Sequence, residues 1–69
     1  MSVWVLTSEV NEYDQFGEYF EHAWPYKPTK EEVEEHVQGK SEDYINWIYS
    51  GGGRTRKYEY KWYHFYEVK

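Results

Sequence analysis

The sequence predicts an α+β fold, a three-stranded antiparallel sheet with two short helices packed on one face, in the order β-β-α-α-β. Three observations carry this prediction. Residues 2–10, 18–24 and 55–69 alternate with the period of a strand. Two segments between the second and third of these show helical spacing behind an N-cap residue. The length, 69 residues, suits a single domain over residues 1–69.

The first strand, residues 2–10, is apolar on both faces at its start, as in a strand that is covered on both sides or packed on a partner. Turn-forming residues over 11–17 connect it to the second strand, and Gly17 is expected to adopt a positive φ. Pro25 then ends the ladder, because proline has no N–H to donate. The first two strands are therefore expected to form a hairpin.

The first helix is expected to begin after Thr29, which forms a capping box with Glu32. Val33 and Val37 mark its buried stripe, and Gly39 closes it. The second helix is expected to follow a second N-cap and to end at a run of glycines. Its residues of interest are the N-cap Ser41, the apolar face Tyr44, Ile45, Ile48 and Tyr49, and Trp47 beside that face.

The last strand is expected over Thr55–Lys69 and is expected to pair with the first strand, which places the first strand in the centre. Every second residue of this strand, on the side that includes Trp62, is interpreted as facing the core as far as Trp62. Beyond Trp62 both faces of the strand are aromatic, which indicates a bulge or a second packing surface near Tyr63–Phe65. The residues on this predicted inner side are Tyr58, Tyr60, Trp62, His64, Tyr66 and Val68.

Aromatic side chains supply most of the expected core, since the chain has 4 Trp, 9 Tyr and 3 Phe. Either the preference of β-strands for aromatic residues accounts for this excess, or some of the rings lie on an interaction surface. A chain this small without cysteine gains stability by association, so a homo-oligomer is expected. The absence of cysteine, of a signal-peptide pattern and of a long apolar run indicates a soluble cytoplasmic protein with no membrane partner.

Charge is distributed unevenly along the chain. Residues 1–50 carry eleven acids and three bases, whereas residues 51–69 carry five bases and two acids. The acidic part disfavours direct binding of nucleic acid, and the basic part suits a small anion.

The segment Gly51–Lys57 combines glycines with bases. Glycine backbone can approach a ligand closely, arginine can fork onto phosphate oxygens, and aromatic side chains can stack on a base. A nucleotide-like anion is one hypothesis, although the spacing is not that of a Walker loop; a solvated connecting loop is the other. The candidate ligand-binding residues are Arg54, Arg56, Lys57, Tyr58, Tyr60 and Trp62.

An acidic ridge is expected over the two helices. One hypothesis is that it imitates a phosphate backbone and blocks the basic groove of a protein that handles nucleic acid; the other is an ordinary solvated helix face. Its members are Glu31, Glu32, Glu34, Glu35, Glu42 and Asp43, and the candidate protein-contact residues are Glu31, Glu34, Glu35 and Trp47.

No catalytic, cofactor or metal pattern is found. His22 and His64 could meet across strands, and His36 is expected to be solvated, but their spacing matches no metal motif. No serine lies in a nucleophile elbow, and a chain this small has little room for a dry active site. The sequence therefore favours a non-enzymatic protein.

The opening VWVLTSEVNEYDQFGEYF, the middle PTKEEVEEHV and the closing YKWYHFYEVK resemble small accessory proteins of bacteriophages and prophages. This resemblance implies a binding role against a host defence system, in the host cytoplasm. The ligand would be a nucleotide-like signal or, in the manner of anti-CRISPR inhibitors, a host defence protein. A structural or assembly module is a further alternative.

Overall fold

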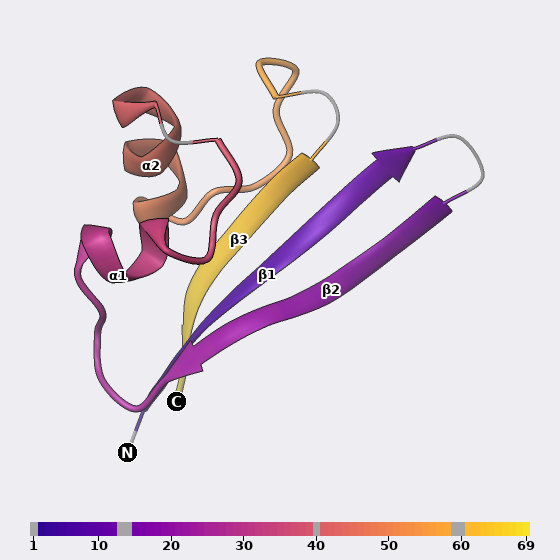
Figure 1. The fold of residues 1–69 in the computed structure, drawn as a ribbon. Helices are drawn as coiled ribbons and strands as arrows, with labels where there is room; N and C mark the ends of the chain where they lie inside the picture. Colours follow the sequence, from indigo (N-terminus) through magenta and orange to yellow (C-terminus); the bar gives the residue numbers. More distant parts are fainter. Residues whose placement is uncertain (1, 13–14, 40, 59–60) are drawn as a thin grey trace.

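In the computed structural model the chain forms one antiparallel sheet of strand order β2-β1-β3, with the helices on one side of it (Figure 1). The elements are β1 (Val3–Glu12), β2 (Gln15–Trp24), α1 (Lys30–Glu34), α2 (Glu42–Tyr49) and β3 (Lys61–Val68). The structure describes residues 2–12, 15–39, 41–58 and 61–69. The fold class, the element order and the central place of the first strand are confirmed.

The hairpin strands are longer than predicted. β1 continues to Glu12 and β2 begins at Gln15, so most of the expected turn over 11–17 is ladder. Gly17 pairs with Val10 and does not have the predicted positive φ. Cross-strand pairing has overridden the local turn preference of these residues.

Both predicted N-caps are present. Glu32 donates its backbone N–H to the Thr29 hydroxyl at 3.3 Å, and the Thr29 backbone N–H donates to the Glu32 carboxylate at 3.3 Å. Ser41 accepts from the backbone N–H of Tyr44 at 3.2 Å. The first helix is shorter than predicted: α1 ends at Glu34, and turns carry the chain on to Val37.

The last strand begins later than predicted and buries the opposite face. Residues 55–58 form no strand, and Tyr60 lies outside the described residues. The helices cover Tyr63 and Phe65, which are 0% and 3% exposed, whereas Tyr66 is 43% exposed. The alternation did not distinguish the two faces, because both carry aromatic side chains.

Of the two explanations for aromatic residues on both faces of the last strand, the bulge is wrong for the paired residues, since β3 pairs with β1 without a register shift from Val3–Val68 to Val10–Lys61. The irregularity lies instead between β1 and β2, at Leu6 and Thr7. A second packing surface stays a prediction.

The core lies between the sheet and the helices. Leu6 from β1 and Tyr63 from β3 meet Val33 and Ile48 from the helical side, and all four are 0% exposed. The whole buried cluster comprises Leu6, Trp24, Val33, Val37, Tyr44, Ile45, Ile48, Tyr63 and Phe65. One sheet face is therefore buried, and no helix or strand within the described ranges covers the other.

Candidate functional site

The glycines after α2 pair with the outer edge of β3. Gly53 donates its N–H to the Tyr63 carbonyl at 2.8 Å, and Phe65 donates to the Gly51 carbonyl at 3.2 Å. The other two amides are also occupied: Gly51 donates to Ile48 at 2.9 Å and Gly52 to Trp47 at 3.0 Å. All three backbone N–H groups that an anion would need are thus bonded within the protein.

Arg54, the first base of the predicted anion segment, is paired with a carboxylate of β1. Its Nε and Nη2 donate to the Glu9 carboxylate at 3.0 Å and 2.6 Å. The hydrogen bond from Arg54 holds the pKa of Glu9 below its ordinary value, and His64 Nε2 lies 3.6 Å from the same carboxylate. The charge of Arg54 is therefore largely compensated.

The other predicted ligand-binding residues lie on two sides of the molecule. Lys57 Nζ is 3.5 Å from Asp43 on α2. Tyr58 packs against Tyr44, with ring centroids 4.4 Å apart. Trp62 lies instead under Arg54, whose guanidinium carbon is 5.6 Å from the ring centroid.

Arg56 is exposed, and no hydrogen bond or ion pair uses its side chain among the described residues. The structure therefore brings Arg54 and Trp62 together but does not bring them to Tyr58.

The three histidines do not converge. His22 pairs with Leu6 on the helical side and stacks on His36, with ring centroids 4.1 Å apart. His64 pairs with Thr7 and points to the other sheet face. The hypothesis that His22 meets His64 is wrong, because their β1 partners are neighbours of opposite parity. The part of the chain that the structure describes holds no cluster of three or more metal-ligating side chains.

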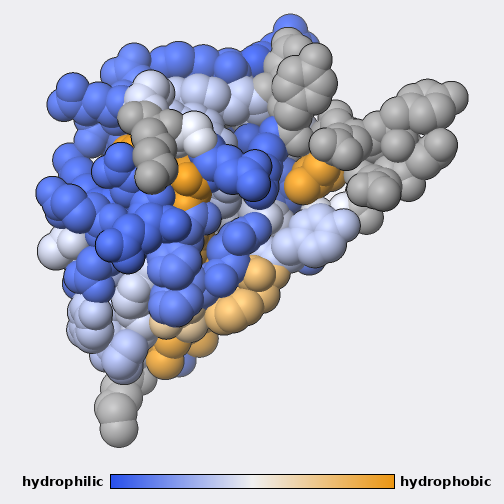
Figure 2. All heavy atoms as spheres, viewed as in Figure 1, coloured by the Kyte–Doolittle hydropathy of each residue, from blue (hydrophilic) through white to orange (hydrophobic). Residues whose placement is uncertain are grey.

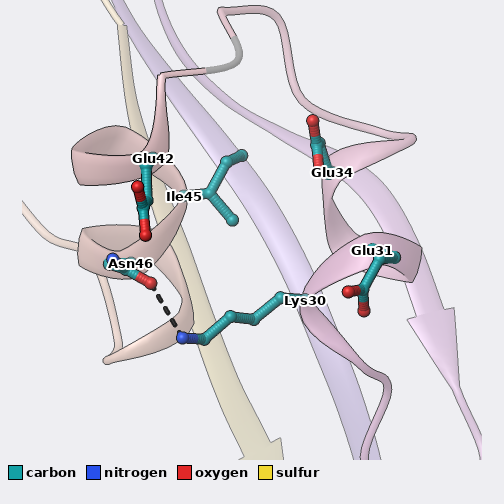
Figure 3. A pocket seen from close by; sticks show the side chains of 6 residues that line it. All are labelled: Lys30, Glu31, Glu34, Glu42, Ile45 and Asn46. Carbon is teal, nitrogen blue, oxygen red and sulfur yellow. Dashed lines mark hydrogen bonds between the residues drawn. The ribbon is translucent and has the colours of Figure 1, made fainter.

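A groove of about 300 Å³ lies between the two helices (Figure 3). Glu31 and Glu34 line it from α1, and Glu42 lines it from α2. Lys30 reaches across one end, where its Nζ donates to Asn46 Oδ1 at 2.8 Å. This groove, which we call the interhelical groove, is lined by Lys30, Glu31, Glu34, Glu42, Ile45 and Asn46.

The chemistry of the interhelical groove is acidic around an apolar floor. Its lining has three carboxylates against one ammonium, and the aliphatic side chain of Ile45 lies between the two walls. Among the described residues, no hydrogen bond or ion pair uses the carboxylates of Glu31, Glu34 or Glu42. The groove thus offers uncompensated negative charge around a small apolar floor, since Ile45 is 5% exposed.

The remaining acidic and aromatic candidates have different surroundings. Glu32 accepts from the Tyr26 hydroxyl at 2.6 Å, and this hydrogen bond is the main cause that lowers the pKa of Glu32. Glu35 is exposed where α1 ends. Trp47 is half-buried, with its ring centroid 4.7 Å from that of Tyr58. Trp47 therefore contributes to an internal aromatic cluster rather than standing clear of the surface.

Sequence reasoning did not single out Ile45 and Asn46 as part of a site. A signal was present, because Glu42 and Asn46 are four residues apart and lie on one side of α2. The opposing wall depends on how α1 packs against α2, which no local pattern reveals.

Comparisons with protein-family models, with curated proteins and with solved structures give no match to this chain. Within the described ranges, neither helix has the length and apolar character required to cross a bilayer. The residues and the geometry above are therefore the basis for a functional assignment.

Proposed function

We propose that this protein is a non-catalytic binding protein that docks its acidic helical face onto a basic surface of another protein. The observation that carries the proposal is the interhelical groove, where Glu34 and Glu42 flank the side chain of Ile45. A lysine or arginine side chain has the matching form: an aliphatic stem for the floor and a cationic head for the carboxylates.

The wider surface supports the same occupant. Glu31 and Glu42 are exposed at the groove, and Asp43 continues the acidic surface with a side chain that is 81% exposed. Hydrophilic side chains cover the helices in Figure 2. Proteins that handle nucleic acid expose dense Lys and Arg for phosphate contacts, so they are the partner class that this surface fits. The resemblance to phage accessory proteins points to a host defence protein of that class.

Capture of a nucleotide-like anion is supported less well. The amides of Gly51, Gly52 and Gly53 already donate within the protein, and Arg54 is held by Glu9. Arg56 is the exposed base that this hypothesis retains.

The proposal is tested by titrating the ¹⁵N-labelled protein with an arginine-rich peptide and, separately, with ATP. We expect the peptide to shift the amide signals of Ile45 and Asn46, with an affinity that falls steeply as salt rises. The double variant Glu34→Gln/Glu42→Gln should weaken peptide binding about tenfold. The control Glu18→Gln/Glu67→Gln removes the same charge away from the groove and should weaken it less than threefold.

If both double variants lost the same affinity for the peptide, the effect would come from net charge alone, and the groove would be excluded as the binding site. Anion capture would replace the proposal if three results came together. These are an ATP-induced shift of the Arg56 and Lys57 signals, the loss of that shift in Arg56→Glu, and no binding of the peptide.

A further inference from the structure

The sheet face opposite the helices, which we call the open face, is defined by cross-strand pairing. Val5 pairs with Ala23 on β2 and with Tyr66 on β3. Directly opposite residues on neighbouring strands point to the same side of a sheet. The same rule places Phe20 on this side, since its partner Thr7 is two residues from Val5. The apolar members of the open face are Val3, Val5, Phe20, Ala23, Tyr66 and Val68.

Exposed hydrophobic side chains concentrate on this face. Among the described residues, the large hydrophobic side chains that are exposed are Val3 40%, Tyr19 49%, Phe20 68%, Tyr26 52%, Tyr66 43% and Val68 48%. All of these except Tyr19 and Tyr26 belong to the open face. Val3 lies opposite Val68, and Val5 lies between Ala23 and Tyr66, so these side chains are neighbours on the sheet. Such a contiguous patch marks an interaction surface more often than isolated exposed residues do.

The opposite end of the open face is polar and internally paired. Glu9 holds Arg54 there, and His64 and Trp62 lie beside them. Glu18 pairs with Glu9 across β1 and β2 and adds an exposed carboxylate to the same end, where it accepts from Thr7 Oγ1 at 3.2 Å. The open face thus divides into an apolar half near the termini and a polar half that keeps one uncompensated carboxylate.

We propose that the apolar half of the open face is the interface with a second copy of this chain. Stacking two open faces about a two-fold axis through their apolar halves buries Phe20 and Tyr66 of both copies and leaves the polar halves at the rim. The charge distribution permits this occupant: the chain has a net charge of −5, but its acidic helices lie on the far side of the sheet and stay apart in the stacked pair, so their mutual repulsion is small. The product is a four-layer arrangement in which the apolar half of each sheet is covered on both faces.

The size of the face sets the expected affinity. Three strands of about eight residues make a face roughly 14 Å wide and 26 Å long. The apolar half is about half of this face, so the stacked pair buries less than the standard area of specific interfaces. We therefore expect a weak dimer with a dissociation constant on the order of 100 µM.

Sedimentation equilibrium between about 5 µM and 1 mM tests this inference without any other partner. We expect the average mass to rise from 8.6 kDa toward twice that value as concentration increases. Phe20→Lys should keep the protein monomeric throughout and Tyr66→Lys should raise the dissociation constant at least tenfold, with far-UV circular dichroism unchanged. Tyr19→Lys is the matched control, because it changes an exposed neighbour on the same strand that points to the helical side, and it should dimerise normally.

A wild type that stays monomeric at 1 mM would overturn the inference. So would a dimer that survives Phe20→Lys and Tyr66→Lys but is lost in Tyr19→Lys, which would place the interface at the β2 edge or the helical side instead.

Discussion

Gly52 lies so close to the backbone of Tyr63 that a side chain at Gly52 would overlap the Tyr63 carbonyl oxygen. Gly52 also has a φ of 68°, in the left-handed region that glycine tolerates best. The contact joins the end of α2 to the outer edge of β3, where an isolated bridge pairs Gly52 with His64. The glycine run thus protects an edge strand, a role distinct from the anion site that its composition suggests.

Gly52→Ala should lower the free energy of unfolding by roughly 2–4 kcal/mol, because the methyl group meets backbone and the left-handed conformation is strained. Urea denaturation followed by tryptophan fluorescence measures this loss. Gly17→Ala is the control, since a Cβ there meets only the end of the Tyr19 side chain, at 3.2 Å. A loss at Gly52 no larger than that at Gly17 would contradict the tight contact.

Glu9→Gln should reduce the dependence of stability on pH under acid conditions. Arg54 lowers the pKa of Glu9 from 4.5, so the pair stabilises the fold above about pH 4.5 and this stabilisation is lost as the pH falls below that value. Wild type and variant should therefore differ most at neutral pH and converge as the pH falls below 4.5. Urea midpoints from pH 7 to 3 report the difference. Glu67→Gln, at a position with no ion pair among the described residues, should run parallel to wild type.

Tyr44→Phe should protect the fold against alkali. Burial, reinforced by Tyr63 and Tyr58, raises the pKa of Tyr44 from 10.0 to about 12. Because the folded pKa lies above the unfolded one, its contribution is complete below pH 10 and is lost as the pH rises toward 12. Urea midpoints at pH 9, 10.5 and 11.5 should fall less steeply in the variant than in wild type. Tyr19→Phe, at an exposed phenol, should fall as steeply as wild type; identical slopes for all three would refute the prediction.

Ser41→Ala should cost about 1 kcal/mol of stability, because it leaves the backbone N–H of Tyr44 at the start of α2 without its side-chain acceptor. Ser41→Asp keeps an acceptor and places a negative charge at the helix N-terminus, so it should be neutral or stabilising. Thermal denaturation of both variants checks the pair. An alanine variant as stable as wild type would show that the cap contributes nothing.

Local patterns were sufficient wherever one side chain or one short period decides the structure. Thr29 and Ser41 identified the helix starts because a hydroxyl before an acidic turn satisfies amides that the helix leaves free. Val33 and Val37 were predicted to be buried and are buried, although Val37 lies beyond the end of α1. The apolar start of the first strand predicted a strand covered on both sides or packed on a partner, and this stays a prediction, since Val3 is 40% exposed.

Tertiary structure alone decided which aromatic face became the core and which charges met. Tyr63 and Phe65 are buried, and Tyr66 is exposed, only because the helices return to one side of the sheet. Arg54 and Glu9 are 45 residues apart, so no local signal links them.

The sequence by itself therefore determined the element order, the caps and the acidic character of the helices, since these depend on neighbours along the chain. The interhelical groove, the edge contact of Gly52 and the open face arise from contacts between distant segments. Their positions depend on how distant segments pack against one another, and a local sequence pattern does not predict that packing.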